Sequence, residues 1–538
     1  MARYAFAFVD GQEIVGQMHE HEATARGTAG AAGPEWPALA GGAVLTSREA
    51  VARYETPERG PRGWTPAVLV PDTEAEVAEI LRFCGRERRP LVISAGRTGL
   101  VEAQRPEGEA VLSLERLARP LAFRTGDGEG VDLAGRTTAE SAAALLAWWQ
   151  DAGRPDLEGS SLTVQAGMAV DAANEIVAGV GLRWPIELGS SSAASVGGCV
   201  ANGSAGANAI RCGTAAHLCA QASGFWADGS AAGPFAGPRW QTVDPLRLAI
   251  DATRVDPALG LIGSQGAFGV ITRASLRLWK LPAAREGVLL PMPDMPTAMR
   301  LLEAAQAAFP GTVEEYEFIG RPALECVLDF LGDAGRLPFP RDRLRPWCVF
   351  LQVDGNATEE LVERLYGFLS EAGIPDVDIG YAPLPTLKRI RHSITESSNV
   401  RMRARGGGRL SFDTAVPRAR FGDYLDTLAA RLARDFPGVE LLAFGHAGVG
   451  GAHLHVLGTQ ERPVAQVKDA LVACVLEVTA AYGGTYSAEH GVGPKWADEF
   501  RRRTPTEHFA RLVAEKRRHD PAGILNPRSF GLVQARGA

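Results

Sequence analysis

Three histidines lie close together in the stretch Phe444–Val456, namely His446, His453 and His455. The glycines of this stretch permit backbone angles that other residues avoid, so we expect two short strands joined by a tight turn that folds His446 back toward His453. His453 and His455 are two residues apart and therefore share one face of the second strand. Two imidazoles held together in this way form a candidate metal site.

A candidate third ligand lies further along the chain, in the glycine-rich bend Tyr486–Gly493, where Glu489 stands beside His490. A single histidine on a strand is more often a packed, hydrogen-bonded residue. Three histidines at matched spacing followed by a Glu-His pair favour a site instead. We predict that His446, His453 and Glu489 hold a divalent metal such as zinc or manganese.

The length, net charge and cysteine spacing of the chain exclude several classes of function. Its 538 residues exceed what one hydrophobic core usually supports, so we expect two or more domains. A net charge of −7 argues against a nucleic-acid partner. The seven cysteines form no Cys-x-x-Cys pair, which argues against a disulfide framework, a zinc ribbon or an iron–sulfur cluster. Without a signal-peptide core or a membrane-spanning apolar run, the expected location is cytoplasmic, with peripheral membrane contact left open.

The elements of the first half suggest a strand-and-helix domain. Short apolar strands are predicted at residues 66–71 and 90–94, and a capping box at Thr73–Glu76 starts a helix between them. Further patterns predict a helix at 138–149 and a strand at 162–167. The loop after the second strand can present backbone N–H groups to an anion, but an ordinary turn is an equally good interpretation. Neither the Rossmann glycine motif nor a P-loop is present.

A run of small residues fills Gly189–Gly206, and such a run lets a flat ligand approach the backbone closely. The stretch Ser195–Gly198 of this run, together with Ile93–Leu100, Arg211-x-Gly213, Asp228-Gly229 and Gly263–Gly269, closely resembles the FAD domain of the vanillyl-alcohol-oxidase/p-cresol-methylhydroxylase superfamily. The chain looks most like the branch of glycolate oxidase, D-lactate dehydrogenase and D-2-hydroxyglutarate dehydrogenase. The resemblance runs from about residue 65 to residue 530.

This resemblance implies an α+β fold, with a two-subdomain FAD-binding domain and an α+β cap domain built on an antiparallel sheet. The expected organisation is an N-terminal extension packing on the FAD domain (1–60), the FAD domain (61–284), the cap or substrate domain (285–500), and a C-terminal segment returning to the FAD domain (501–538).

The resemblance also implies noncovalent FAD, because no histidine is placed to tether it. The pyrophosphate is expected on the first loop and on the Ser195 segment, although Ala95 and Arg97 make that loop less glycine-rich than usual, and Arg97 could reach a phosphate. The implied cofactor-binding residues are Ser94, Ala95, Gly96, Arg97, Thr98, Gly99, Leu100, Ser195, Gly197, Gly198, Asn202, Gly206, Gly266, Val270 and Asn526.

Substrate-binding residues are implied in a basic helix expected at Lys388–Thr395, where Arg391 and Thr395 match the family's substrate-facing pair. A solvated charged face is the alternative interpretation. A mobile loop is expected at Arg405–Arg409. Where 2-hydroxyglutarate-type members carry a lysine, this chain has Ser411, so Arg403, Arg405 or Arg409 could replace that charge. His455 stands where an asparagine is usual, and Val449 and Gly451 also depart from the pattern, which suggests an altered pocket.

The implied reaction is oxidation of a D-2-hydroxy acid to the 2-oxo acid by hydride transfer to flavin N5, with His490 as the base and the metal acidifying the hydroxyl. The expected catalytic residues are His490, Arg391, Thr395 and His455. Electrons would pass to a quinone, a cytochrome or an electron-transfer flavoprotein, and the protein could be a homodimer. The alternatives are an O₂-using flavin oxidase of an alcohol or phenol, and a non-catalytic FAD-binding subunit.

Overall fold

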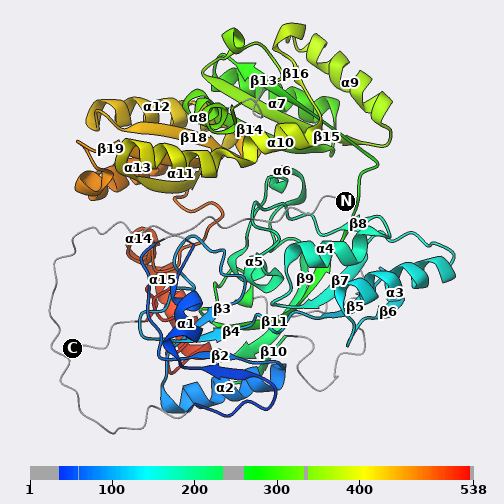
Figure 1. Ribbon diagram of the computed structural model, residues 1–538, viewed down its shortest axis with the longest axis vertical. Coiled ribbons are helices and arrows are strands. Elements are labelled where there is room, and N and C mark those ends of the chain that lie inside the picture. The colour runs from blue at the N-terminus through cyan, green and yellow to red at the C-terminus, as the bar shows by residue number, and fades with distance from the viewer. Residues whose placement is uncertain (1–35, 59, 234–259, 333–336, 534–538) are drawn as a thin grey trace. The chain divides into compact units, whose positions relative to one another are not determined.

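The computed structural model describes residues 36–58, 60–233, 260–332 and 337–533 (Figure 1). The chain divides into a unit at Met1–Pro37 and a unit at Ala38–Ala538. Most of the predicted N-terminal extension thus lies outside the described residues. All elements below belong to the second unit.

The part of the second unit from β1 (Ala43–Leu45) to β12 (Trp279–Lys280), in which the resemblance leads us to expect FAD, is called the FAD half below, and the part from β13 (Ala284–Met292) to α13 (Lys468–Ala481) the cap half. The first sheet of the FAD half has the strand order β1-β2-β4-β3 and mixes strand directions. Its central strands run parallel, and β1 pairs antiparallel with β2. Helix α2 begins at Thr73 with the predicted capping box, because the Thr73 side chain accepts from Glu76 N–H and Glu76 reaches back to the cap. The elements are β1 (Ala43–Leu45), α1 (Arg48–Glu55), β2 (Val68–Val70), α2 (Glu74–Glu87), β3 (Leu91–Ser94) and β4 (Ala110–Ser113).

The second sheet of the FAD half is antiparallel, with the strand order β10-β9-β11-β7-β5-β6. A hairpin turn at Asp228-Gly229 joins β9 to β10. The elements here are β5 (Pro120–Arg124), β6 (Gly130–Asp132), α3 (Thr138–Asp151), β7 (Ser161–Gln165), α4 (Val170–Ala178), β8 (Leu182–Arg183), α5 (Val196–Asn202), α6 (Ala209–Cys212), β9 (Cys219–Trp226), β10 (Ala231–Ala232), β11 (Gly269–Arg277) and β12 (Trp279–Lys280).

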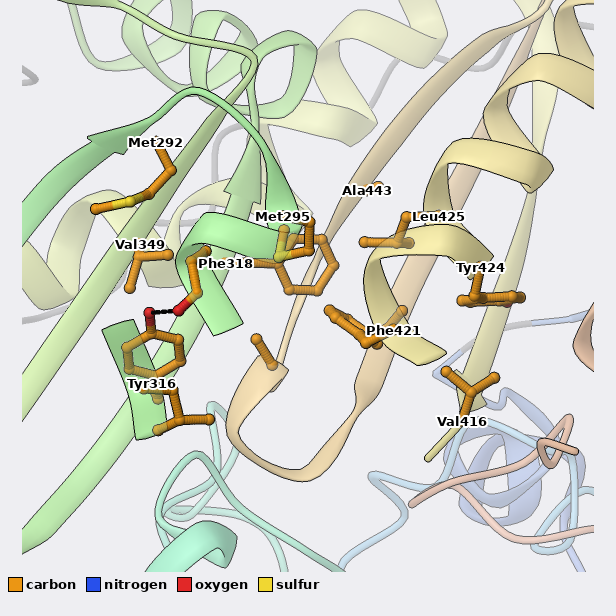
Figure 2. Close-up of a cluster of buried hydrophobic side chains, with 14 of the residues drawn as sticks. Met292, Met295, Tyr316, Phe318, Val349, Val416, Phe421, Tyr424, Leu425 and Ala443 are labelled. Atoms are coloured by element: carbon orange, nitrogen blue, oxygen red, sulfur yellow. Dashed lines mark hydrogen bonds between the residues drawn. The ribbon is translucent and has the colours of Figure 1, made fainter. Parts of the chain in front are cut away.

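The cap half is one seven-stranded antiparallel sheet with the order β16-β13-β15-β14-β18-β19-β17. Both of its faces are covered, so residues of one strand alternate between two cores. Val288 and Leu290 belong to one core with α7 (Met295–Ala308), α9 (Thr358–Glu371), α12 (Phe421–Asp435) and α13 (Lys468–Ala481). Leu289 belongs to the other core, with α8 (Arg321–Leu331), α10 (Leu384–His392) and α11 (Ile394–Arg405). Figure 2 shows the first core, in which Phe318 meets Phe421 edge to face. The α+β fold with an antiparallel cap sheet is therefore confirmed.

The elements of the cap half follow in chain order, omitting single-turn helices. They are β13 (Ala284–Met292), α7 (Met295–Ala308), β14 (Val313–Gly320), α8 (Arg321–Leu331), β15 (Trp347–Gly355), α9 (Thr358–Glu371), β16 (Gly380–Tyr381), α10 (Leu384–His392), α11 (Ile394–Arg405), β17 (Gly406–Ala415), α12 (Phe421–Asp435), β18 (Glu440–Gly445), β19 (Gly451–Thr459) and α13 (Lys468–Ala481). Helices α14 (Ala497–Arg503) and α15 (Thr506–His519) follow in the chain, and α15 packs on the FAD half, where Lys516 Nζ donates to the Ala267 carbonyl and His519 stacks on Trp226.

Two local predictions in the cap are wrong. The basic helix expected at 388–395 is two helices that meet at Ser393, so Arg391 closes α10 while Thr395 lies in the first turn of α11. The expected mobile loop at 405–409 is the end of α11 running directly into β17. Gly406 has φ +71°, which ends the helix, and a Cβ on Gly407 would lie 2.2 Å from the backbone of β19. These glycines give the chain a sharp bend and a close strand contact.

The end of the described chain returns to the first sheet. Leu91 N–H donates to the Ile524 carbonyl at 2.7 Å, and Asn526 N–H donates to the Leu91 carbonyl at 2.8 Å, so this segment forms a parallel bridge beside the edge strand β3. Within the described ranges, none of the helices combines the length and the apolar character needed to cross a bilayer.

Candidate metal and active site

The predicted histidine hairpin exists and brings its two ligands together. His446 follows β18, a single helical turn at Ala447–Val449 reverses the chain, and β19 carries His453 back. His446 Nε2 lies 3.3 Å from His453 Nε2 and 3.0 Å from Glu489 Oε1. The second Glu489 oxygen lies 3.9 Å from His453 Nε2. One ligand atom of each residue can be chosen so that all three lie within 4.8 Å of one another.

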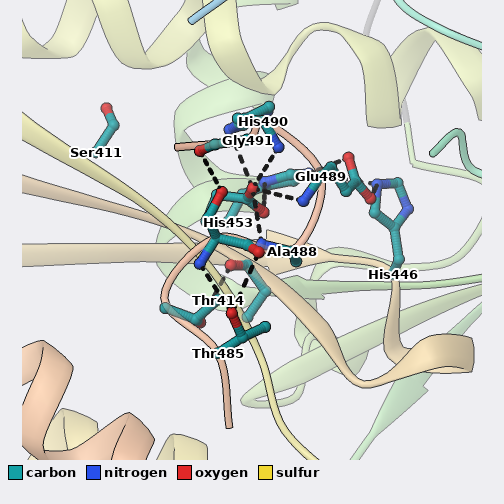
Figure 3. A network of polar contacts seen from close by, with 12 residues as sticks. Ser411, Thr414, His446, His453, Thr485, Ala488, Glu489, His490 and Gly491 are labelled. Carbon is teal, nitrogen blue, oxygen red and sulfur yellow. Dashed lines mark hydrogen bonds and ion pairs between the residues drawn. The ribbon is translucent and has the colours of Figure 1, made fainter. Parts of the chain in front are cut away.

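The turn that carries Glu489 and His490 is fixed by Asp413 of β17 (Figure 3). One oxygen of Asp413, Oδ2, accepts backbone N–H bonds from Ala488, Glu489 and His490 at 3.1, 2.8 and 2.9 Å. A buried carboxylate that collects three N–H donors holds a loop tightly, because removing it would leave those donors unpaired. The FAD half adds a fourth contact, from Asn202 Nδ2 to the Glu489 carbonyl at 2.8 Å.

His446 is oriented by a buried carboxylate on its other side. Glu317 Oε1 lies 2.6 Å from His446 Nδ1, which leaves Nε2 for the site. Burial opposes the imidazolium form of His446, but Glu317 and Glu489 outweigh it and hold the pKa of His446 well above its usual value. The cluster thus attracts a positive charge, which fits a cation site.

The pKa of His453 is shifted in the opposite direction from that of His446. Burial and the neighbouring His446 place the pKa of His453 well below its usual value, which favours the neutral imidazole that a metal needs. Asp413 Oδ1, a buried oxygen with no hydrogen-bond partner among the described residues, lies 3.7 Å from His453 Nδ1. A small approach would complete a carboxylate–histidine pair and direct Nε2 inward. The donor set of two imidazoles and one carboxylate therefore fits zinc or manganese.

A cavity of about 100 Å³ opens beside this cluster. His490 lines it, with its ring stacked on that of His453 at a centroid distance of 5.4 Å and its Nδ1 3.3 Å from Asp413 Oδ2. The full lining is Leu100, Val101, Thr395, Ser411, Phe412, Asp413, Phe444, His453, His455, His490, Lys495 and Trp496.

The structure separates the predicted substrate-binding residues. Thr395 and His455 line the cavity, and His455 Nδ1 lies 2.9 Å from Ser398 Oγ. Arg391 lies behind the lining residue Phe444, with its guanidinium 5.1 Å from that ring, and donates to Glu317. Arg391 therefore shares the Glu317 carboxylate with His446, a predicted metal ligand.

The two segments predicted to bind the pyrophosphate meet in the structure. A Cβ on Gly96 would lie 2.2 Å from the Ala193 carbonyl oxygen and 2.8 Å from Ser195 N, so only glycine allows this approach. A Cβ on Gly197 would lie 2.4 Å from the Cβ of Ala166. The buried Ser94 hydroxyl has no hydrogen-bond partner among the described residues. A glycine-lined cradle with an unpaired hydroxyl fits a cofactor with phosphate oxygens.

Arg97 contacts Glu115 and Tyr54 in the structure, and its predicted role toward a phosphate stays a prediction. It has φ +57°, its Nη1 donates to Glu115 Oε2 at 3.1 Å, and its guanidinium lies 4.9 Å from the centre of the Tyr54 ring. The contacts of Arg97 thus join the loop to α1.

The other predicted cofactor residues are spread over both sheets of the FAD half. Ala95, Thr98 and Gly99 follow β3, and Gly198 N–H donates to Ser195 Oγ. Leu100 reaches the cavity. Asn526 Nδ2 donates to the Gln265 carbonyl beside Gly266, and Ile93 N–H donates to Asn526 Oδ1. Gly206 packs against the Glu187 backbone, and Val270 is fully buried in β11.

Three residues that sequence reasoning did not assign to the site take part in it. Glu317 orients His446, Asp413 holds the Glu489 turn, and Gln265 Oε1 accepts from Val492 and Gly493 N–H at 3.2 and 2.8 Å. One signal for Glu317 was available: Glu315 and Glu317 are acidic residues two apart in β14, a strand whose residues are all buried.

Two known families match the chain in sequence. Residues 65–232 match the family described as FAD binding domain, and residues 281–530 match FAD linked oxidases, C-terminal domain. A protein named D-2-hydroxyglutarate dehydrogenase from Xanthomonas citri is 26% identical over 87% of this chain and 90% of its own length. The mitochondrial D-2-hydroxyglutarate dehydrogenase of Bos taurus is 28% identical over 87% of this chain and 77% of its own.

Solved structures agree on the fold. A p-cresol methylhydroxylase with bound substrate superposes with a TM-score of 0.63 at 14% identity, covering 91% of this chain and 94% of its own. The 4-ethylphenol oxidase from Gulosibacter chungangensis gives the same TM-score and coverage at 17% identity. At such identities the likeness concerns the fold alone.

Proposed function

We propose that this chain, which is a member of the FAD-linked oxidases of the vanillyl-alcohol-oxidase/p-cresol-methylhydroxylase superfamily, oxidises a D-2-hydroxy acid to the 2-oxo acid. The observation that carries the proposal is the meeting of His446, His453 and Glu489 beside a cavity lined by His490. The names of the similar proteins support the substrate class, since several are D-2-hydroxyglutarate dehydrogenases and one, from Schizosaccharomyces pombe, is a putative D-lactate dehydrogenase.

Removing two hydrogens from a secondary alcohol needs a hydride acceptor, a base and a way to make the hydroxyl more acidic. FAD bound in the glycine-lined cradle supplies the acceptor, and zinc or manganese bound by His446, His453 and Glu489 supplies the Lewis acid. His490 is the proposed base. Its Nδ1 lies 3.3 Å from Asp413 Oδ2, so the carboxylate can orient the imidazole and stabilise the imidazolium that forms.

The substrate carboxylate is assigned to Thr395, His455 and Arg391. Thr395 and His455 line the cavity. Arg391 does not line it, so this side chain either moves past Phe444 to contact the carboxylate or attracts it through its charge from the far side of the Phe444 ring. Arg391 also balances the buried charge of Glu317, a carboxylate whose pKa is lowered, against burial, by His446 and Arg391.

Reoxidation requires a second partner, and we expect a quinone, a cytochrome or an electron-transfer flavoprotein. A protein named D-2-hydroxyglutarate–pyruvate transhydrogenase is also among the relatives, so a 2-oxo acid is a further acceptor to include.

Stopped-flow reduction of the bound flavin by a panel of D- and L-2-hydroxy acids tests the proposal, before and after treatment with EDTA. We expect D-acids to bleach the flavin, and EDTA to slow that step until zinc or manganese is restored. Failure of every acid, or reduction unaffected by metal removal, contradicts this mechanism. Hydrogen peroxide formation from a phenol without any metal effect would point to the oxidase alternative.

A further inference from the structure

Two rows of side chains lie side by side on the face of the cap sheet that carries the proposed metal ligands, and each row pairs one residue of β19 with one residue of β17. In the strand pairing, His453 lies opposite Asp413, and His455 lies opposite Ser411. Residues two apart on a strand share a face, so the second row lies about 7 Å along the strands from the first. Figure 3 shows Ser411 apart from the Glu489–His490 turn. Both rows line the same cavity.

A lysine from another segment lies at this second row. Lys495 follows the turn that carries Glu489 and His490, and its Nζ donates to the Ser411 carbonyl at 3.2 Å. The same ammonium lies 4.7 Å from the centre of the Trp496 ring, and both residues line the cavity. Lys495 thus places a positive charge within reach of the cavity at the row farther from His446.

The backbone on both sides of Lys495 is held in place by hydrogen bonds and a close contact. Gln265 Oε1 accepts from Val492 and Gly493 N–H, and a Cβ on Gly493 would lie 2.3 Å from the Val101 carbonyl oxygen. Trp496 N–H donates to the Val492 carbonyl at 3.1 Å. A lysine whose main chain is fixed on both sides samples a restricted volume, which favours its use in recognition.

The charges around the second row favour an anion there. Arg409 donates to Ser398 Oγ, the hydroxyl that contacts His455, and so adds a positive charge behind the row. The single carboxylate among the described lining residues is Asp413, and its Oδ2 is already bonded to three backbone N–H groups. The described residues at the far end of the cavity thus include two cationic side chains, Lys495 in its lining and Arg409 behind it.

We infer that Lys495 selects substrates that carry a second anionic group, so that the preferred D-2-hydroxy acid is a dicarboxylate. This inference rests on the proposed function. The carbon that bears the hydroxyl would lie at the first row, near His453 and His490, with the neighbouring carboxylate toward Thr395 and His455. The distal carboxylate would reach the ammonium of Lys495 beside Ser411. The charge that would recognise the distal carboxylate comes from the segment after the Glu489 turn.

The test compares two acids of equal carbon-chain length, D-2-hydroxyglutarate and D-2-hydroxyvalerate, which differ in the distal carboxylate. In the Lys495→Met variant, kcat/KM for D-2-hydroxyglutarate should fall by about 10- to 100-fold, as expected for loss of a charge-assisted hydrogen bond. The value for D-2-hydroxyvalerate should change by less than about 3-fold, because it makes no contact that this variant removes. Lys495→Arg should keep the preference.

A relocated charge provides the sharpest control. The double variant Ser411→Lys/Lys495→Met should regain part of the preference for D-2-hydroxyglutarate, because the ammonium returns to the same row from the strand. Equal losses for both acids in Lys495→Met, or an unchanged preference, would overturn the inference, since the lysine would then serve only the packing of Trp496 and Ser411.

Calorimetric binding of the product analogues separates this inference from the proposed function. 2-Oxoglutarate should bind the unaltered holoprotein more tightly than 2-oxovalerate, and Lys495→Met should abolish the difference. If that holds while no hydroxy acid reduces the flavin, the reaction is wrong and the anion site stands. If the flavin is reduced and the binding difference does not depend on Lys495, the inference is wrong and the reaction stands.

Discussion

Asp413 and Glu489 lie on different segments of the cap, and the carboxylate of the first accepts the backbone N–H of the second at 2.8 Å. The same oxygen also holds the neighbouring residues of that turn, while the other oxygen of Asp413 faces His453. One side chain thereby sets the positions of two ligands that are far apart in the sequence.

Two substitutions at Asp413 should separate these roles. In Asp413→Asn, the amide oxygen can still accept from the turn, but an amide replaces the carboxylate beside His453, so metal affinity should fall by about 10- to 100-fold with a small change in Tm. Asp413→Ala should lose both metal affinity and several degrees of Tm, because three buried N–H groups lose their acceptor. Competition with a chromophoric chelator measures the affinity, and Asp329→Asn, a change at an exposed carboxylate, is the control. Equal metal affinity in all three variants would exclude this role for Asp413.

His490→Ala should bind FAD and metal as the unaltered protein does but reduce the flavin about 10²- to 10⁴-fold more slowly, as general bases typically contribute. The side chain of His490 lines the cavity and is not one of the three proposed ligands. Single-turnover reduction gives the rate, and flavin absorbance with elemental analysis gives the cofactor content. Parallel loss of FAD or metal would show that His490 supports the structure of the site rather than the proton transfer.

The hairpin with His446 and His453 was predictable because glycine spacing and strand alternation are properties of a short window of sequence. Its partners were harder to identify. Glu317 precedes His446 by 129 residues, and it reaches the ring only because β14 pairs with β18. Such register across a sheet is set by the whole cap core, which no local pattern contains.

The loop after β3 was also predictable only in part. The close approach of Gly96 to Ser195 was predictable, because Gly96 has no side chain and the resemblance placed both segments at the cofactor. The pairing of Arg97 with Glu115 depends instead on how α1 packs beside the loop, with Tyr54 between. Likewise, no proline or glycine marks the break between α10 and α11 at Ser393. The sequence therefore predicted one helix that carries both Arg391 and Thr395.

Gly96→Ala should prevent normal FAD loading. The added Cβ would lie 2.2 Å from the Ala193 carbonyl oxygen, which is backbone and cannot turn away, so the two cofactor segments must separate. We expect the purified variant to retain a small fraction of the flavin and to lose several degrees of Tm. Gly179→Ala in the same half is the control, since a Cβ there meets nothing within 4 Å and the residue has helical angles. Full flavin content in Gly96→Ala would place the cofactor elsewhere.

Glu76 should make the stability of the FAD half depend on pH. Its carboxylate is buried and accepts N–H bonds from Gly41, Gly42, Asp72 and Thr73, and although burial alone would raise it, these bonds lower the pKa of Glu76 from 4.5 to about 2. A carboxyl group whose pKa is lowered by folding stabilises the protein fully above its unfolded value, and that stabilisation is lost as the pH falls from about 4.5 towards 2.

Glu76→Gln should therefore reduce the free energy of unfolding by about 1–3 kcal/mol near pH 7, the range for losing charge-assisted hydrogen bonds in a partly enclosed site. The difference between the two proteins should shrink below pH 4, because protonated Glu76 resembles glutamine. Urea unfolding of the holoprotein at pH 7, 5 and 3 measures the difference. Glu79→Gln is the matched control, because Glu79 lies on the exposed face of the same helix and accepts none of the four N–H bonds that Glu76 accepts. A difference that stays constant with pH would mean that Glu76 acts through its shape and not its charge.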